Sequence, residues 1–347
     1  MMVQFAIVTT TLSARDRVLR TKQPTRTSGA HTDVGPVVED FGGIETLNEF
    51  YAAYGWDCRY RQIGQGVLRV EVMTRVAGSL VFGRESVSQR LWGHAKSADG
   101  MVSVIVSLAD ARNMINGRQL ETDRLFIVPP NTIMDIVLAS GADALTVLIP
   151  IDLYDECAAS MGKDYLPAAS SELMVICVHD GGLEPVRQLS RRIFSNATDL
   201  SDLFLDELCR AVKSDGSHIL THDPYNRFLK HANTMQALEY IHEHLADHIS
   251  MEELCEFCGT SLSTLERNFK RFVGVTPRNY IATARLNRAR RDLLNPDYFE
   301  SSIAEIAMRN NLLHMGRFSE NYRELFGRLP SEERQIAANG DGRSTNS

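Results

Sequence analysis

The stretch GTSLSTLERNFKRFVG, residues 259–274, combines an apolar stripe with a basic one. Its large apolar residues recur at helical spacing, which predicts a helix with one face packed against a core; they are Leu262, Leu265, Phe269 and Phe272. The other face carries three basic residues, Arg267, Lys270 and Arg271. The stretch therefore predicts an amphipathic helix that is held by its apolar face and presents cations on the other.

Positive charge is concentrated around this stretch. Residues 261–291 contain eight Lys or Arg and one acid, Glu266, so their net charge is 8 − 1 = +7 in a chain whose net charge is −7. The rest of the chain therefore sums to −7 − 7 = −14. Ordinary exposed helix faces mix both signs, so a focused basic patch on an acidic body favours a localised polyanion site over a merely solvated face.

The C-terminal third contains an internal near-repeat. Its two copies are LCEFCGTSLSTLERNFKRFVGVTP (254–277) and IAMRNNLLHMGRFSENYRELFGRLP (306–330). Each copy predicts a short helix, a turn at Gly259 or Asn311, and a second helix that ends in G-x-x-P. Gly and Asn tolerate the left-handed backbone that a tight turn between helices requires. Each copy is therefore predicted to form a helix-turn-helix unit.

Capping patterns fix where these helices begin. Ser250 with Glu253, and Ser302 with Glu305, have the spacing of a capping box at the start of each copy. Between the copies, Thr276 followed by a proline predicts the start of the helix PRNYIATARLNRARRDLLN (277–295). The sequence thus predicts an all-helical domain over 231–334, in which one long basic helix joins two helix-turn-helix units.

This arrangement resembles the AraC-type (AraC/XylS) family of transcription regulators. The resemblance rests on the paired units, on RLNRARRDLLN (285–295) in the connecting helix, and on SSIAEIAMRNN (301–311) and RFSENYRELFGRLP (317–330) in the second unit. It implies a regulator that binds double-stranded DNA and acts with RNA polymerase as an activator. It also implies a small-molecule effector bound in an N-terminal cupin-like domain, and a homodimer supported by helices within 152–214.

The resemblance also implies roles for single residues in the first unit. Its base-reading positions fall on Ser263, Glu266 and Arg267, and Arg267 is the strongest candidate because a guanidinium can bond a guanine edge at two points. Contacts to phosphate, which position a protein without specifying sequence, are expected from three further residues: Lys270, Arg271 and Arg278.

The second unit departs from the family pattern. Asn311 stands where Gly is usual, and Leu313 replaces a small residue expected to cap the second helix. The recognition positions fall on Met315, Gly316, Arg317 and Glu320. Only Arg317 among them donates hydrogen bonds strongly, so we expect this unit to read fewer bases than the first.

The N-terminal half has a different pattern. Eight short segments, mostly rich in β-branched or aromatic residues, predict strands over 56–64, 66–74, 79–86, 88–96, 101–109, 123–130, 132–139 and 144–150. Helical periodicity follows within 152–214. The predicted fold class is therefore α+β, with a β-rich cupin-like barrel and helices before the all-α domain. The expected divisions are a weakly structured segment (1–45), an effector-sensing and dimerisation domain (46–214), a linker (215–230), the DNA-binding domain (231–334) and a flexible tail (335–347).

Two groups of residues allow more than one interpretation. Tyr60, Trp92 and His94 would line the barrel if it binds a small molecule, and would otherwise form an ordinary core. Cys255 and Cys258 form a C-x-x-C near several histidines, but the absence of a second such pair favours packing over a zinc or redox site. We therefore expect no metal and no cofactor.

Composition narrows the remaining classes. Six scattered cysteines, and the lack of a membrane span or a signal peptide, favour a cytoplasmic protein. Nothing in the sequence supports a Ser/His/Asp or paired-carboxylate site, so we expect no enzyme; a cupin-like metalloenzyme is disfavoured because His94 is the only histidine in 55–150. A protein-interaction module, whose basic helix binds an acidic partner, stays open as an alternative.

Overall fold

A computed structural model describes residues 34–53, 56–161, 173–178, 181–195, 200–220 and 224–341. The N-terminal half contains two facing antiparallel sheets. The larger sheet has the order β1 (Val34–Phe41), β3 (Val70–Ala77), β4 (Leu80–Val87), β11 (Ala142–Pro150), β6 (Met101–Ser107), β9 (Arg124–Val128), β12 (Met174–Cys177), β13 (His218–Ile219). The smaller sheet has the order β2 (Cys58–Gln62), β5 (Leu91–Lys96), β10 (Ile133–Leu138), β7 (Asn113–Ile115), β8 (Arg118–Leu120).

The eight strand segments predicted from the sequence are confirmed, because each overlaps one of the strands β2 to β6 or β9 to β11. The remaining strands are short or lie outside the predicted β region. The β7–β8 hairpin turns at Asn116 and Gly117, whose φ angles of 49° and 66° suit the Asn-Gly turn favoured between paired strands. That dipeptide was the sequence signal that could have revealed this hairpin.

Three predicted boundaries are wrong. Residues 34–41 form β1, which pairs with β3, so the weakly structured segment does not extend to residue 45; residues 1–33 lie outside the described part. Within the predicted linker, His218 and Ile219 pair with β12 as β13, and α6 already begins at Pro224. The predicted tail is helical as far as Asp341, because α12 spans Pro330–Asp341.

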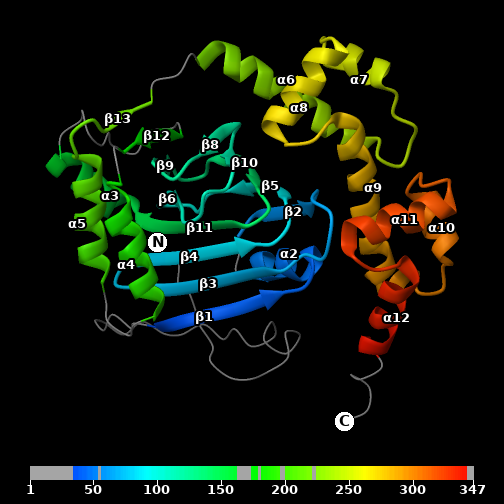
Figure 1. The fold of residues 1–347 in the computed structure, drawn as a ribbon, viewed down its shortest axis with the longest axis horizontal. Helices are drawn as coiled ribbons and strands as arrows, with labels where there is room; N and C mark the ends of the chain where they lie inside the picture. The colour runs from blue at the N-terminus through cyan, green and yellow to red at the C-terminus, as the bar shows by residue number, and fades with distance from the viewer. Residues whose placement is uncertain are drawn as a thin grey trace.

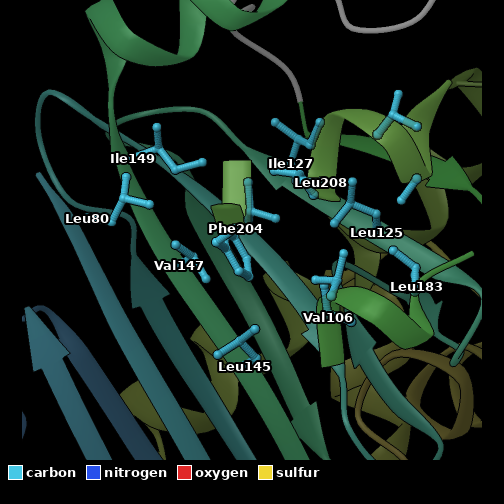
Figure 2. Packing of buried hydrophobic residues seen from close by; sticks show 14 of the residues in the cluster. Leu80, Val106, Leu125, Ile127, Leu145, Val147, Ile149, Leu183, Phe204 and Leu208 are labelled. Carbon is cyan, nitrogen blue, oxygen red and sulfur yellow. The ribbon is translucent and has the colours of Figure 1, made fainter. Parts of the chain in front are cut away.

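Three helices cover the outer face of the larger sheet: α3 (Ile151–Met161), α4 (Glu184–Ser195) and α5 (Ser201–Val212) (Figure 1). Alternate residues of the central strands point into this layer, such as Val102, Val104 and Val106 of β6. Phe204 of α5 is fully buried at its centre, among sheet residues including Val147, and its ring meets that of Phe82 edge-on at 5.1 Å (Figure 2). This layer is the largest apolar core of the N-terminal domain.

The inner faces of the two sheets enclose two smaller cores. One includes Tyr60, Val72 and Leu91, and is closed by α2 (Ile44–Ala53); the other includes Ile105, Phe126 and Met134. A cavity lies between the sheets, lined by residues next to both cores. The predicted β-rich domain followed by helices is therefore confirmed, and its interior is only partly filled by side chains.

The C-terminal domain is helical. Its elements are α6 (Pro224–Glu243), α7 (Met251–Phe257), α8 (Leu262–Phe272), α9 (Pro277–Leu294), the 3-10 helix η1 (Pro296–Tyr298), α10 (Ile303–Arg309), α11 (Met315–Phe326) and α12. The units have separate cores, and α9 contributes Tyr280 and Ile281 to one, Ala289 and Leu293 to the other. Among the helices in the described part of the chain, none combines the length and apolarity needed to cross a membrane.

The two domains are packed together. Ile63, Trp92 and Val137, from the outer side of the smaller sheet, belong to the same apolar core as α6 to α9. Gly117, in the β7–β8 turn, lies so close to Phe272 of α8 that a Cβ there would overlap the ring. The β domain therefore serves as one wall of the core of the first helix-turn-helix unit.

Replacing Phe204 by alanine tests the helical layer. We expect Phe204→Ala to lower the free energy of unfolding of the N-terminal domain by about 3–5 kcal/mol, because a fully buried aromatic ring is lost from a packed core. Urea unfolding followed by tryptophan fluorescence reports on this domain, since both tryptophans, Trp56 and Trp92, lie in it. Leu203→Ala, on the same helix but 41% exposed, is the control and should cost less than about 1 kcal/mol.

Candidate nucleic-acid interface

Both helix-turn-helix units begin with the capping boxes predicted from the sequence. The side chains of Ser250 and Ser302 accept hydrogen bonds from the backbone N–H of Glu253 and Glu305, whose carboxylates accept from the serine N–H groups in return. Thr276 likewise caps α9 by accepting from the N–H of Asn279. These reciprocal bonds satisfy donors that would otherwise be orphaned at the helix starts, which fixes the position of each short helix.

The predicted turns are also confirmed. Gly259 and Asn311 have φ angles of 58° and 53°, so both adopt the left-handed backbone at equivalent points of the two units. The Asn311 side chain donates to the backbone oxygen of Asp247 at 2.7 Å, a bond that a glycine could not make. The departure from Gly at this position therefore adds a link between the second unit and the loop that precedes α7.

Helix α8 has the two faces expected of a recognition helix. Leu265, Phe269 and Phe272 are buried, whereas Leu262 is 39% exposed and does not belong to the core face predicted for it. Ser261 caps the helix by accepting from the N–H of Thr264. Four of the predicted DNA-contacting residues of this helix are exposed and Glu266 is half-buried; the exposed ones are Ser263, Arg267, Lys270 and Arg271.

The eight basic residues of 261–291 do not all face solvent. Arg285 donates to the backbone oxygens of Leu245 and Asp247 at 3.1 and 2.6 Å, which holds the end of the α6 region against α9. Arg290 is buried and pairs with Glu45 at 3.3 Å and Glu333 at 2.9 Å. Two of the eight cations are therefore structural, while Arg278 at the start of α9 is exposed as expected.

The second recognition helix, α11, is built with less polar capping. Its N-cap is His314, one residue later than the Leu313 expected from the sequence, and no side chain forms a cap hydrogen bond there. Phe318 and Tyr322 anchor the helix in the second core. The residues at the predicted recognition positions are all exposed: Met315, Gly316, Arg317 and Glu320.

A helix-turn-helix domain model matches residues 254–336, which include both units and the connecting helix. The C-terminal domain belongs to the AraC/XylS family. In a helix-turn-helix motif the second helix is the one that lies in the major groove of DNA, and in the two units here that helix is α8 or α11.

Two curated relatives and one solved structure illustrate the similarity. The XylDLEGF operon transcriptional activator of Pseudomonas putida is 41% identical over 97 residues, which are 28% of this chain and 30% of that protein. A probable thc operon regulatory protein of Rhodococcus erythropolis is 33% identical over 97 residues, 28% of this chain and 29% of that protein. A crystal structure of an AraC-type transcriptional regulator from Chromobacterium violaceum is 30% identical, with a TM-score of 0.29, and covers 31% of this chain and 93% of that one. The matched region thus spans under a third of each of these two curated relatives.

The three residues expected to line the barrel lie on opposite sides of the smaller sheet. Tyr60 lines the cavity, and its ring lies where a Cβ of Gly93 would otherwise stand. Trp92 and His94 point to the opposite, outer side of β5, because side chains alternate along a strand. Trp92 packs against Tyr280 of the AraC-type domain at 5.5 Å, and His94 is bonded to Asp135 at 2.9 Å. Trp92 therefore has the core position that was the alternative interpretation, and neither Trp92 nor His94 lines this cavity.

The C-x-x-C sequence has the packing role favoured by its context. Cys258 is buried in the core of the first unit, and Cys255 is packed beside it. His244 stacks on Tyr240 with ring centroids 4.2 Å apart and bonds to its backbone oxygen. Over the ranges that the structure describes, no group of three or more His, Cys, Asp or Glu side chains is arranged to hold a metal ion.

Sequence reading by α8 can be tested at Arg267. If Arg267 bonds a base edge at two points, Arg267→Ala should cost about 1–3 kcal/mol on a duplex selected by the protein and should relax preference at one base position. The measurement is a binding titration over every single-base variant of that duplex. An equal loss on all duplexes would identify Arg267 as a phosphate contact.

Some basic residues are exposed and others are bonded within the protein. The salt dependence of DNA binding should distinguish the two kinds. Lys270→Ala should lower the slope of log affinity against log salt concentration by about one, because one phosphate contact is lost. Arg285→Ala should leave that slope unchanged and instead lower the melting temperature of the domain, since its guanidinium binds backbone oxygens. A reduced slope for Arg285→Ala would contradict the structural role assigned to it.

Proposed function

We propose that the protein is a sequence-specific DNA-binding transcription regulator whose activity responds to a small molecule bound in the β domain. The observation that carries this proposal is the pair of helix-turn-helix units, each with an exposed recognition helix, joined by α9 and packed on a domain with an internal cavity. Activation through RNA polymerase, dimerisation through the helices within 152–214 and a cytoplasmic location are part of the same proposal.

Direct hydrogen bonds join the β domain to both units. Asn287 of α9 exchanges two bonds with the backbone of Gln62, accepting from its N–H at 3.2 Å and donating to its oxygen at 2.8 Å. The Gln62 side chain donates to the backbone oxygen of Leu325, and the N–H of Gly66 donates to that of Glu324 at 2.9 Å. Arg90 donates to the oxygen of Gly274 after α8 at 3.0 Å. The β domain thus sets the position of one unit relative to the other.

A buried ion network reinforces this docking. Arg290 of α9 lies between Glu45 of α2 and Glu333 of α12, and its guanidinium is 4.9 Å from the ring centre of Phe326. The Arg290 and Glu333 side chains are only 8% and 5% exposed. Removing one partner of such a network leaves a charge unpaired away from water, so we expect the docked arrangement to depend strongly on it.

Two elements that contact α9, α2 and β2, also line the cavity. Tyr51 of α2 and Tyr60 of β2 line it, while Glu45 of α2 and Gln62 of β2 contact α9. A ligand that repositions α2 or β2 would change the contacts that hold the two units together. We propose that this shifts a pre-existing equilibrium between arrangements that differ in affinity for DNA.

Selection of bound duplexes from a random library, with and without candidate metabolites, tests the proposed function. A regulator should enrich a defined sequence, and an effector should change its affinity for that duplex. A module for acidic protein partners would instead bind all duplexes with the same salt-dependent affinity, and would enrich none. That outcome would refute the proposal in favour of the alternative.

The docking itself can be measured by amide hydrogen exchange. Glu45→Gln should speed exchange of the Gly66 amide by about tenfold or more, because that amide bonds across the interface and a loss of about 1.4 kcal/mol corresponds to a factor of ten. Glu49→Gln, at an exposed position of the same helix, is the matched control and should leave the rate unchanged. Equal rates in both variants would show that the ion network does not hold the domains together.

A further inference from the structure

The cavity between the two sheets is a separate site from the DNA-binding surface. Its volume is about 400 Å³, enough for a small organic molecule. Apolar side chains from several strands line it, among them Val72, Ile105 and Leu148. Among the charged residues on its lining, Asp57, Lys96 and Asp99 are exposed, and Arg84 is bonded to Asp143. The chemistry of its interior therefore depends on the few polar groups that point inward.

One carboxylate stands inside this apolar lining. Glu85 lies on β4, and its two oxygens accept hydrogen bonds from different tyrosines: Oε1 from the hydroxyl of Tyr51 at 2.9 Å, and Oε2 from that of Tyr60 at 3.2 Å. A carboxylate oxygen can accept more than one hydrogen bond, so both oxygens keep acceptor capacity. The tyrosines fix the orientation of the carboxylate without neutralising it.

Glu85 lacks a compensating cation among the residues that the structure describes. The neighbouring Arg84 forms two bonds to Asp143, at 2.9 and 2.6 Å. Burial raises the pKa of Glu85 to about 7, although the two tyrosine hydroxyls act in the opposite direction. A cation that entered the cavity would supply the missing partner and favour the ionised carboxylate.

Aromatic rings stand beside this carboxylate. Trp56 is stacked on Tyr51, with centroids 5.5 Å apart and planes 15° from parallel, and the Tyr60 ring lies 6.0 Å from that of Tyr51. The Trp56 indole lies against β4 at Gly83, where a Cβ would be in ordinary van der Waals contact with it at 3.8 Å. Aromatic faces attract cations through their quadrupole, so the rings and the carboxylate favour the same class of ligand.

We propose that this cavity binds a small protonated amine with an apolar body, and that its ammonium group pairs with Glu85 beside Tyr51, Tyr60 and Trp56. As an effector site, this assignment rests on the proposed function, whereas the binding itself does not. The apolar lining would hold the body of the ligand. An anionic ligand would instead place its charge against an uncompensated carboxylate in a poorly solvated space, which is unfavourable.

Three probes of similar shape test the ligand class on the full chain: 2-phenylethylammonium, 2-phenylethanol and phenylacetate. Isothermal titration calorimetry at pH 8 should show the amine binding at least about tenfold more tightly than the alcohol, a difference of about 1.4 kcal/mol. Phenylacetate should not bind measurably. The proposal is overturned if the amine fails to bind at millimolar concentration, or if the alcohol or the acid binds as tightly.

Charge removal at Glu85 provides the matched test. Glu85→Gln keeps the size and one acceptor oxygen of the side chain, and should abolish the preference for the amine over the alcohol. Glu156→Gln, at an exposed position of α3, removes the same charge away from the cavity and should preserve that preference. A preference that survives Glu85→Gln would refute the pairing.

The dependence on pH gives a readout that needs no variant. Between pH 8 and pH 6 the amine stays protonated while Glu85 gains its proton, so affinity should fall about tenfold. The other titratable groups around Glu85 are Tyr51, Tyr60 and Cys58, whose pKa values burial raises further above their ordinary values, and Asp57, which is exposed. The pKa of His94 is raised mainly by its bond to Asp135, but it lies on the outer side of β5. Unchanged affinity over this range would contradict pairing with Glu85.

Failure of the amine-binding proposal and failure of the proposed regulatory function give different experimental results. If no duplex is enriched by the protein, the regulatory role fails, but the calorimetry still decides which ligand the cavity takes. If a neutral or anionic molecule controls DNA binding and the amine does not bind, the regulatory role stands and the assignment to Glu85 is wrong.

Discussion

Helix α9 is the constraint on which the arrangement of the two domains depends. Its apolar residues are divided between the cores of the two helix-turn-helix units, and its polar residues Asn287 and Arg290 reach the β domain. One helix therefore fixes the spacing of the recognition helices and receives contacts from the domain that contains the cavity. A substitution at any of these residues would disturb one of the two cores or the contact with the β domain.

This constraint changes the interpretation of the basic segment. Charge counting alone assigns all eight cations to a polyanion site, yet Arg285 and Arg290 are used to hold neighbouring elements together. A guanidinium can satisfy backbone oxygens or carboxylates inside a protein as readily as phosphates outside it. The segment therefore has fewer exposed cations than its sequence suggests; they are Arg267, Lys270, Arg271, Arg278 and Arg291.

Short paths along β2 and α2 join the lining of the cavity to residues that contact α9. Tyr60, which lines the cavity, and Gln62, which bonds to Asn287, are only two positions apart on β2. On α2, less than two helical turns separate Tyr51 from Glu45. Under the proposed function, a change at the cavity would reach both recognition helices through the packed interface that the sheets share with the units.

Local features could be predicted from the amino-acid sequence: eight strands, both capping boxes, the turns at Gly259 and Asn311, and the family of the C-terminal domain. These features depend on periodicity and on contacts between residues a few positions apart, which a single sequence records. Three facts could not be predicted in this way: Trp92 faces the helical domain, Arg290 is buried, and Glu85 lines the cavity. These facts depend on which face of a strand or helix packs against a segment distant in sequence. The alternation of side chains along a strand defines two faces, but does not show which segment each face contacts.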